Sequence, residues 1–154
     1  MKKYMVIFVA IGIAALLYQQ LTIRTLQQEI GLSYERNVQI ATNKINETLQ
    51  LLASTSIDDE MLLMDFTETI NVSLTLSRLP NSAMQQLAEQ LKVSGEQLHP
   101  TYFEKTTPEA LSTQFQEILT QLTSLQQSFE SDPHIWYKQI NSDSQTVNQL
   151  KGGI

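Results

Sequence analysis

Between Lys3 and Arg24 the chain has twenty consecutive residues without a charge, and no other feature restricts its possible folds as strongly. The first fifteen of them, residues 4–18, are apolar apart from two tyrosine hydroxyl groups. A helix rises about 1.5 Å per residue, so about 20 residues cross a hydrocarbon core of about 30 Å. The pattern therefore predicts a signal anchor, a single transmembrane helix over residues 1–23.

Aromatic and small residues are placed along this segment as they are in membrane helices. Tyr4 and Tyr18 stand near its ends, where interfacial aromatic residues are enriched, and the paired lysines at its start favour a cytoplasmic N-terminus. Two alanines four residues apart form a small face on which a second membrane helix can pack. The residues expected to form the anchor are Tyr4, Phe8, Ala10, Ala14, Leu17 and Tyr18.

The anchor and the absence of cysteine predict a protein of the bacterial inner (cytoplasmic) membrane. It would be single-pass, with its N-terminus inside and residues 24–154 forming an extracytoplasmic domain. A cleaved secretory signal is one alternative, but no A-x-A-like pair of small residues closely follows the apolar core. A buried core helix is the other alternative.

Beyond Arg24, apolar residues recur at intervals of three or four, which is the period of a helix with one buried face. This stripe starts directly after the predicted span and has one irregular step near Gly31. The membrane helix is therefore expected to continue outward as one rod about 70 Å long. The residues of the stripe are Leu26, Ile30, Tyr34, Val38, Ala41, Ile45, Leu49 and Leu52.

The segment after this rod is compatible with two kinds of element. Ser56 is the expected N-cap of a second helix, because the residues that follow it are acidic and complement the positive end of the helix dipole. The expected core-facing residues of this helix are Leu63, Phe66, Ile70 and Leu74. Residues 70–77 also alternate between apolar and polar, as in a strand. The chain has no second alternating run to pair with them, which favours the helix.

Two shorter helices are expected on either side of a longer one. Asn81 or Ser82 caps the first, before a connector over residues 95–106, and Asp132 followed by Pro133 starts the last. The first is expected to bury Met84, Leu87, Ala88 and Leu91. The last is expected to bury Trp136, Ile140, Val147 and Leu150.

The longer helix between them has the most regular pattern in the chain. It begins either with Thr107 as cap and Pro108 in the first turn, or with Thr106 and Glu109 as a capping box. Its apolar seam steps by fours and threes through Leu111, Phe115, Ile118, Leu122, Leu125 and Phe129. Short connections between these helices favour antiparallel neighbours. The expected fold is all-α, with the transmembrane helix continuing into an antiparallel bundle of about four to five helices.

The composition excludes much of the chemistry that proteins perform. There is no cysteine, which removes disulfides, thiolate metal sites and cysteine nucleophiles, and His99 and His134 have no partner at metal-ligand spacing. The acidic run Asp58–Glu60 lacks the glycine-centred loop of a calcium site. A net charge of −6 argues against nucleic-acid binding. We expect no catalytic residue, no metal, no cofactor and no enzymatic activity.

The sequence therefore favours a non-catalytic, membrane-anchored helical interaction protein, a subunit or accessory of a bacterial envelope assembly of the secretion, pilus, division or conjugation type. Its partners would be the membrane, other envelope proteins and a second copy through the apolar seam, unless the seam is buried within one chain. The candidate contact residues are Tyr102, Phe103, Trp136 and Tyr137. These aromatics would otherwise plug the ends of the bundle. The alternative functions are a sensory or ligand-binding ectodomain acting through a membrane partner, and an envelope protein that disturbs membranes.

Overall fold

A computed structural model describes residues 2–129 and 131–141, with side chains from residue 11 onward. Within these ranges the chain forms helices and no strand, which confirms the predicted all-helical fold. The helices are α1 (Lys2–Leu52), α2 (Asp59–Ser77), α3 (Ser82–Glu96), α4 (Pro100–Phe103), α5 (Pro108–Phe129) and α6 (Pro133–Ile140).

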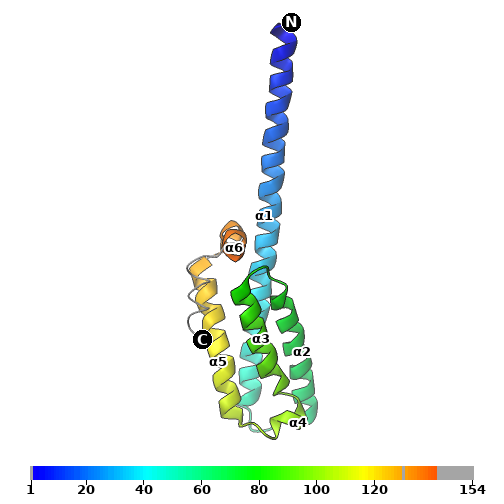
Figure 1. Ribbon diagram of the computed structural model, residues 1–154. Helices are drawn as coiled ribbons and strands as arrows, with labels where there is room; N and C mark the ends of the chain where they lie inside the picture. The colour runs from blue at the N-terminus through cyan, green and yellow to red at the C-terminus, as the bar shows by residue number, and fades with distance from the viewer. Residues whose placement is uncertain (1, 130, 142–154) are drawn as a thin grey trace.

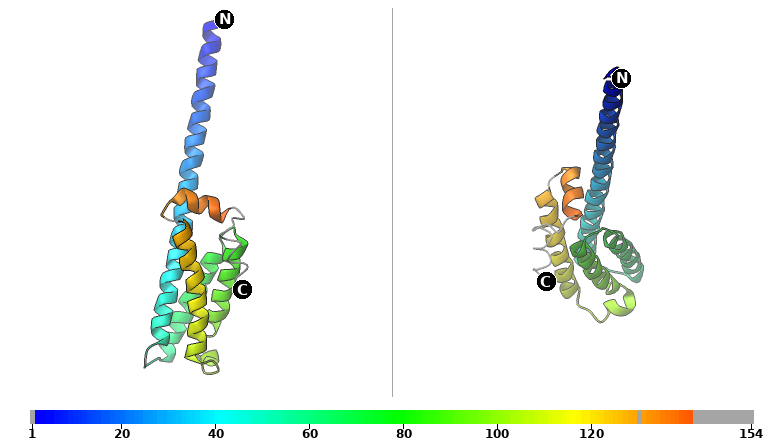
Figure 2. Two further views of the ribbon diagram at one scale, coloured as in Figure 1. Left: turned by 90° about the vertical axis from the view of Figure 1, so that its left-hand side faces the viewer. Right: turned by 45° about the horizontal axis from the view of Figure 1, so that its top comes forward.

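The second half of α1 packs with α2, α3 and α5 as a four-helix bundle in which successive long helices run in opposite directions (Figures 1 and 2). The short α4 lies at one end of this bundle, and α6 crosses its other end to lie against α1 (Figure 1). The first half of α1 projects beyond the bundle as a free rod. The strand considered for residues 70–77 is not formed, because these residues continue α2.

The α1 helix is continuous over 51 residues, as the rod prediction required. Inside the bundle its apolar stripe is buried at Val38, Ala41, Ile45 and Leu52. Outside the bundle the same stripe continues along the projecting rod, where Ile30 is exposed. The second half of α1 is therefore part of the bundle core, whereas its first half has no neighbour among the described residues.

The seam of α5 forms the centre of the core. All six of its predicted residues are buried, and the four predicted core residues of α3 are buried as well. Thr107 accepts a hydrogen bond from the backbone N–H of Ala110, which selects the first of the two predicted helix starts. The seam is covered by helices of the same chain and is not a free surface for a second copy.

The inward face of α2 differs from the predicted one. The residues that it buries are Leu62, Asp65, Thr69, Ser73 and Leu76. Leu63 and Leu74, predicted to face the core, are 44% and 49% exposed, whereas Phe66 and Ile70 are partly buried. The prediction was wrong by one residue position around the helix. Apolar periodicity misplaced the core because this helix turns a mostly polar stripe toward its neighbours.

Three helix ends also differ from the predicted ones. Asp58, not Ser56, caps α2, since its carboxylate accepts the backbone N–H of Met61 at 2.8 Å. The α3 helix does not stop at Gly95 but runs through it to Glu96. The α6 helix, capped by Asp132 as predicted, ends at Ile140. Val147 and Leu150, assigned to the same helix, lie outside the described residues.

The close approach of α6 to α1 depends on a glycine. A methyl group on Gly31 would overlap the carbonyl oxygen of Pro133, and it would lie 2.6 Å from the carbonyl carbon of that residue. In this position α6 buries Trp136 against Phe129, with their rings edge to face and 5.0 Å between centroids. The irregular step in the apolar stripe at Gly31 is thus the contact point of α6.

Candidate functional site

One candidate surface lies at the end of the bundle formed by the connector. His99 caps α4, and its ring packs edge to face on Phe66 at 5.4 Å and tilted against Tyr102 at 6.0 Å. The ammonium group of Lys105 lies 5.9 Å from the centre of the Tyr102 ring. These side chains line a hollow of about 590 Å³, with Glu96 also at its edge. An exposed aromatic ring flanked by both charges is suited to contact with a protein partner.

The four predicted contact residues occupy different environments. Tyr102 is exposed in this hollow, while Phe103 is partly buried against the core. Trp136 is only 1% exposed, and Tyr137 in the same helix is partly buried. The structure brings Trp136 to the α6 end of the bundle, where it plugs the core, and leaves Tyr102 as the candidate for contact.

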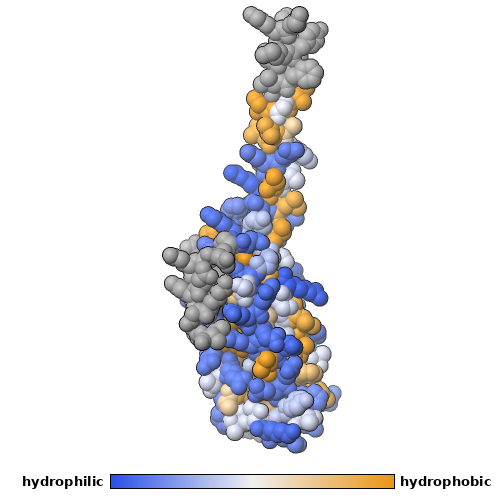
Figure 3. Space-filling model, in the orientation of Figure 1, coloured by the Kyte–Doolittle hydropathy of each residue, from blue (hydrophilic) through white to orange (hydrophobic). Residues whose placement is uncertain are grey.

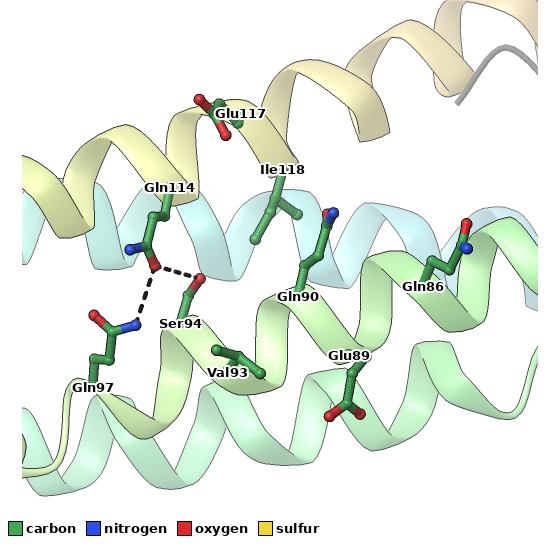
Figure 4. A pocket seen from close by; sticks show the side chains of 9 residues that line it. All are labelled: Gln86, Glu89, Gln90, Val93, Ser94, Gln97, Gln114, Glu117 and Ile118. Carbon is green, nitrogen blue, oxygen red and sulfur yellow. Dashed lines mark hydrogen bonds between the residues drawn. The ribbon is translucent and has the colours of Figure 1, made fainter. Parts of the chain in front are cut away.

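A second candidate surface is a groove between α3 and α5, with a volume of about 510 Å³ (Figure 4). Val93 and Ile118 provide its apolar surface, and Glu89 and Glu117 its charges. Its other lining residues are Gln86, Gln90, Ser94, Gln97 and Gln114. We call this surface the α3–α5 groove.

Glutamine amides make up most of the polar lining of the groove. At one end Gln114 reaches across from α5, and its carbonyl oxygen accepts hydrogen bonds from the hydroxyl of Ser94 at 3.0 Å and the amide of Gln97 at 3.4 Å (Figure 4). Two turns farther along the same face of α5, the buried Oε1 of Gln121 has no hydrogen-bond partner in the described part of the chain. This groove was not predicted from the sequence, in which the recurrence of glutamine at positions 86, 90 and 97 is the signal that points to it.

The most buried charged group of the bundle joins α1 to α2. The Lys44 ammonium lies 2.5 Å from carboxylate oxygens of both Asp65 and Glu68, and the hydroxyl of Thr48 donates to the other oxygen of Asp65 at 2.8 Å. Lys44, Thr48 and Asp65 are buried, whereas the Glu68 side chain is half exposed. The Lys44 ammonium and both oxygens of the Asp65 carboxylate are engaged within the group, so we assign it a structural role.

Burial by itself would lower the pKa of Lys44, but its hydrogen bonds and charge attraction to Asp65 and Glu68 outweigh burial and raise the pKa above 10.5. The stability that this shift contributes is fully present below about pH 10.5 and is lost as the pH rises through the folded-state pKa. We expect the urea midpoint of unfolding to fall more steeply above this pH in the wild type than in a Lys44→Met/Asp65→Leu variant. Equal slopes in the two proteins would contradict the assignment.

The acidic run considered for a cation has other roles. Asp58 caps α2, and the nearby Asp65 is paired with Lys44. In the described part of the chain no group of three or more histidine, cysteine, aspartate or glutamate side chains has the arrangement of a metal site. His99 accepts the backbone N–H of Thr101, and His134 is exposed in the first turn of α6.

The projecting part of α1 exposes large apolar side chains between Ile11 and Ile23. Hydrophobic residues are visible along the face of this rod that Figure 3 shows. Leu16 is 62% exposed and Tyr18 is 72% exposed, and Leu17 and Ala14 are exposed beside them. The side chains of Tyr4, Phe8 and Ala10 lie outside the described residues. Among the described residues, no helix includes a stretch that is both long enough and apolar enough to span a membrane.

Comparisons with known proteins give no relative of this chain. No family model matches it, and neither a curated protein nor a solved structure is significantly similar to it. The functional assignment therefore depends on the sequence and the structure of the chain itself.

Proposed function

We propose that this protein is a non-catalytic interaction module held to the bacterial inner membrane by its N-terminal helix. The observation that carries the proposal is the apolar rod of α1, whose side chains from Ile11 to Ile23 are exposed outside the bundle. Apolar side chains around a whole helix are unfavourable in water and favourable in lipid. The uncharged sequence of residues 4–23 supports the same conclusion.

The proposal places the bundle close to the membrane surface. If residues 1–23 form the anchor, the helix emerges at Arg24 and meets α6 at Gly31. Seven residues of helix correspond to about 10 Å. The α6 end of the bundle would thus face the lipid headgroups, and the hollow around Tyr102 would be the part farthest from the membrane. That end is positioned to meet another envelope protein.

Arginine substitutions in the rod test the anchor. We expect an Ile13→Arg/Leu17→Arg variant to be lost from the membrane fraction, because each arginine near the centre of a span costs about 2.5–3.5 kcal/mol of insertion free energy. A Leu26→Arg/Leu32→Arg variant is the matched control, since both leucines are exposed on the same helix beyond the predicted span. The measurement is the fraction of protein that remains with membranes after alkaline extraction. Equal retention of the two variants would refute the anchor.

Site-specific photo-crosslinking in cells tests the interaction function. A photoreactive residue in place of Tyr102 is expected to give a defined product with an envelope protein, identified by mass spectrometry. The same residue in place of Asn46, which is exposed on α1 within the bundle, is the control. Products of equal yield at both positions, or none at Tyr102, would exclude this end of the bundle as the partner surface.

The volume of the α3–α5 groove favours a sensory or ligand-binding ectodomain as the second candidate function. About 510 Å³ falls in the range of pockets that bind small molecules, about 300–1,000 Å³. A ligand of the groove would raise the thermal unfolding temperature with its concentration. A Gln90→Arg variant, which places a long side chain in the groove, would lose that response.

A further inference from the structure

We propose that the α3–α5 groove and the hollow around Tyr102 form one docking surface, and that it binds a basic, amphipathic helical segment of the partner protein. The inference rests on the proposed interaction function and deepens it by assigning the chemistry of the partner. It does not depend on the membrane anchor.

The groove and the hollow meet on α3. Val93 and Gln97 line both of them, so the two are continuous across the last turns of this helix. We call the two together the joined surface. Along α3 the groove extends from Gln86 to Gln97, a distance of about 17 Å. This is the length of about three turns of a helix, so the joined surface can accommodate a helical segment of a partner lying along α3.

The apolar groups of the joined surface come from four helices. Val93 of α3 is 48% exposed and Tyr102 of α4 is 55% exposed, whereas Phe66 of α2 and Ile118 of α5 are less exposed. A large exposed aromatic residue beside apolar groups is typical of a contact surface between proteins. An amphipathic helix binds such a surface through apolar residues spaced three or four positions apart.

Carboxylates stand on both sides of the exposed valine. Glu89 and Glu96 are exposed on α3, four positions before Val93 and three positions after it. The three residues therefore share one face of the helix, with the two carboxylates about 10 Å apart along it. Glu117 is exposed on α5, on the other side of the groove (Figure 4). The apolar centre of the joined surface is thus flanked by negative charge.

The cations nearby do not cancel this charge. Among the described residues that line the joined surface, Lys105 is the one cation against three glutamates. Lys92 lies beside the surface and forms an exposed pair with Glu89 at 3.5 Å, which a cation of the partner can replace at little cost. His99 accepts a backbone N–H through Nδ1, which requires that this nitrogen is unprotonated. The lining residues therefore have a net negative charge.

This charge selects among the possible occupants. A second copy docked through the same surface would bring identical carboxylates together, and anionic lipid headgroups would be repelled. A small molecule in either hollow leaves the continuity of the two without a role. A basic helix matches all of these features, with an apolar residue on Val93 and a lysine or arginine about one turn to each side, near Glu89 and Glu96.

Photo-crosslinking of the full-length protein in cells tests the joined surface. A photoreactive residue in place of Val93 is expected to capture the same envelope protein as one in place of Tyr102. The captured peptide, identified by mass spectrometry, should contain lysine or arginine about one turn before and after an apolar residue. No product at Val93, a product with a second copy, or an acidic peptide would overturn the inference. The proposed function would still be supported if Tyr102 alone gave a product.

Charge reversal tests the chemistry of the partner. A Glu89→Lys/Glu96→Lys change is expected to lower the crosslinking yield at Val93 about tenfold, because two attractive contacts become repulsive. The matched control is Glu29→Lys/Glu60→Lys, which changes the net charge equally at exposed positions outside the joined surface and should change the yield by less than about twofold. Equal yields in the reversed and control proteins would contradict the inference.

Two further variants separate loss of binding from loss of folding. A Glu89→Gln/Glu96→Gln change removes the attraction without adding repulsion, and it should lower the yield about threefold at an unchanged thermal unfolding temperature. Replacing the two captured cations of the partner by glutamate should restore the yield of the Glu89→Lys/Glu96→Lys protein. Failure of this exchange to restore the yield would show that the carboxylates do not pair with the partner.

Discussion

Replacing Gly31 by alanine should detach α6 from α1 and lower the free energy of unfolding by about 3 kcal/mol. The added methyl group meets the backbone carbonyl of Pro133, which cannot rotate away as a side chain can. Overpacking of this kind costs about 1–3 kcal/mol, and loss of Trp136 from the core removes an interaction worth about 3–5 kcal/mol. The gain in helix propensity from glycine to alanine offsets about 1 kcal/mol of this loss.

Detachment of α6 can be measured by tryptophan fluorescence, because Trp136 is the single tryptophan of the protein and lies in α6. We expect its fluorescence emission to shift to longer wavelength in the Gly31→Ala protein without denaturant, as the ring enters water. The helical circular dichroism signal should change little, since the other helices keep their own contacts. Unchanged emission together with unchanged stability would show that α6 does not dock at Gly31.

Two other glycines provide graded controls. Gly12 is in the same helix and has no atom within 4 Å of an added methyl group, so Gly12→Ala should be neutral or slightly stabilising. In Gly95→Ala the methyl group would lie 2.8 Å from the Thr69 side-chain methyl, which can shift. Its cost should fall between those of the other two substitutions. The order Gly12, Gly95, Gly31 is the expected result in urea denaturation.

The helices with strong local signals could be predicted from the sequence. The seam of α5 is apolar at regular steps, so its buried face follows from periodicity alone, and the caps at Asn81 and Asp132 follow from the affinity of their side chains for free N–H groups. The single α1 rod followed from an apolar stripe that has no strong helix-breaking signal. Each of these features depends on residues that are close to one another in the sequence, which is why the sequence predicts them.

The features that sequence reasoning missed are set by distant partners. The irregular step at Gly31 was visible, but the sequence could not show that Pro133 would approach it. The hollow at Tyr102 and the α3–α5 groove are each lined by residues from different helices. The sequence does not show which helices pack side by side, so it could not predict either surface. The buried face of α2 was mispredicted for a different reason. The apolar residues of this helix form one stripe along it, whereas the buried ion pair of Asp65 with Lys44 turns a different stripe toward the core.

Because the ion pair of Lys44 and Asp65 sets which stripe of α2 faces inward, its removal is the second substitution for which we expect a large effect on stability. We expect Lys44→Met to lower the free energy of unfolding by about 3–5 kcal/mol, because it leaves the Asp65 carboxylate buried with only the Thr48 hydroxyl as a side-chain partner. Asp65→Leu should cost less, since Lys44 keeps its contact with the half-exposed Glu68. The control is Lys92→Met, which removes an exposed pair with Glu89 and should change stability by less than about 1 kcal/mol.

The double variant Lys44→Met/Asp65→Leu separates stability from specificity. Removing both charges eliminates the uncompensated carboxylate, so its stability should return to within about 1 kcal/mol of the wild type or exceed it. The ion pair would then no longer hold the polar stripe of α2 inward against the competing stripe that contains Leu63 and Leu74. We expect faster amide hydrogen exchange in α2 of the double variant, at unchanged global stability. Wild-type exchange in α2 would show that apolar packing alone sets the orientation of this helix.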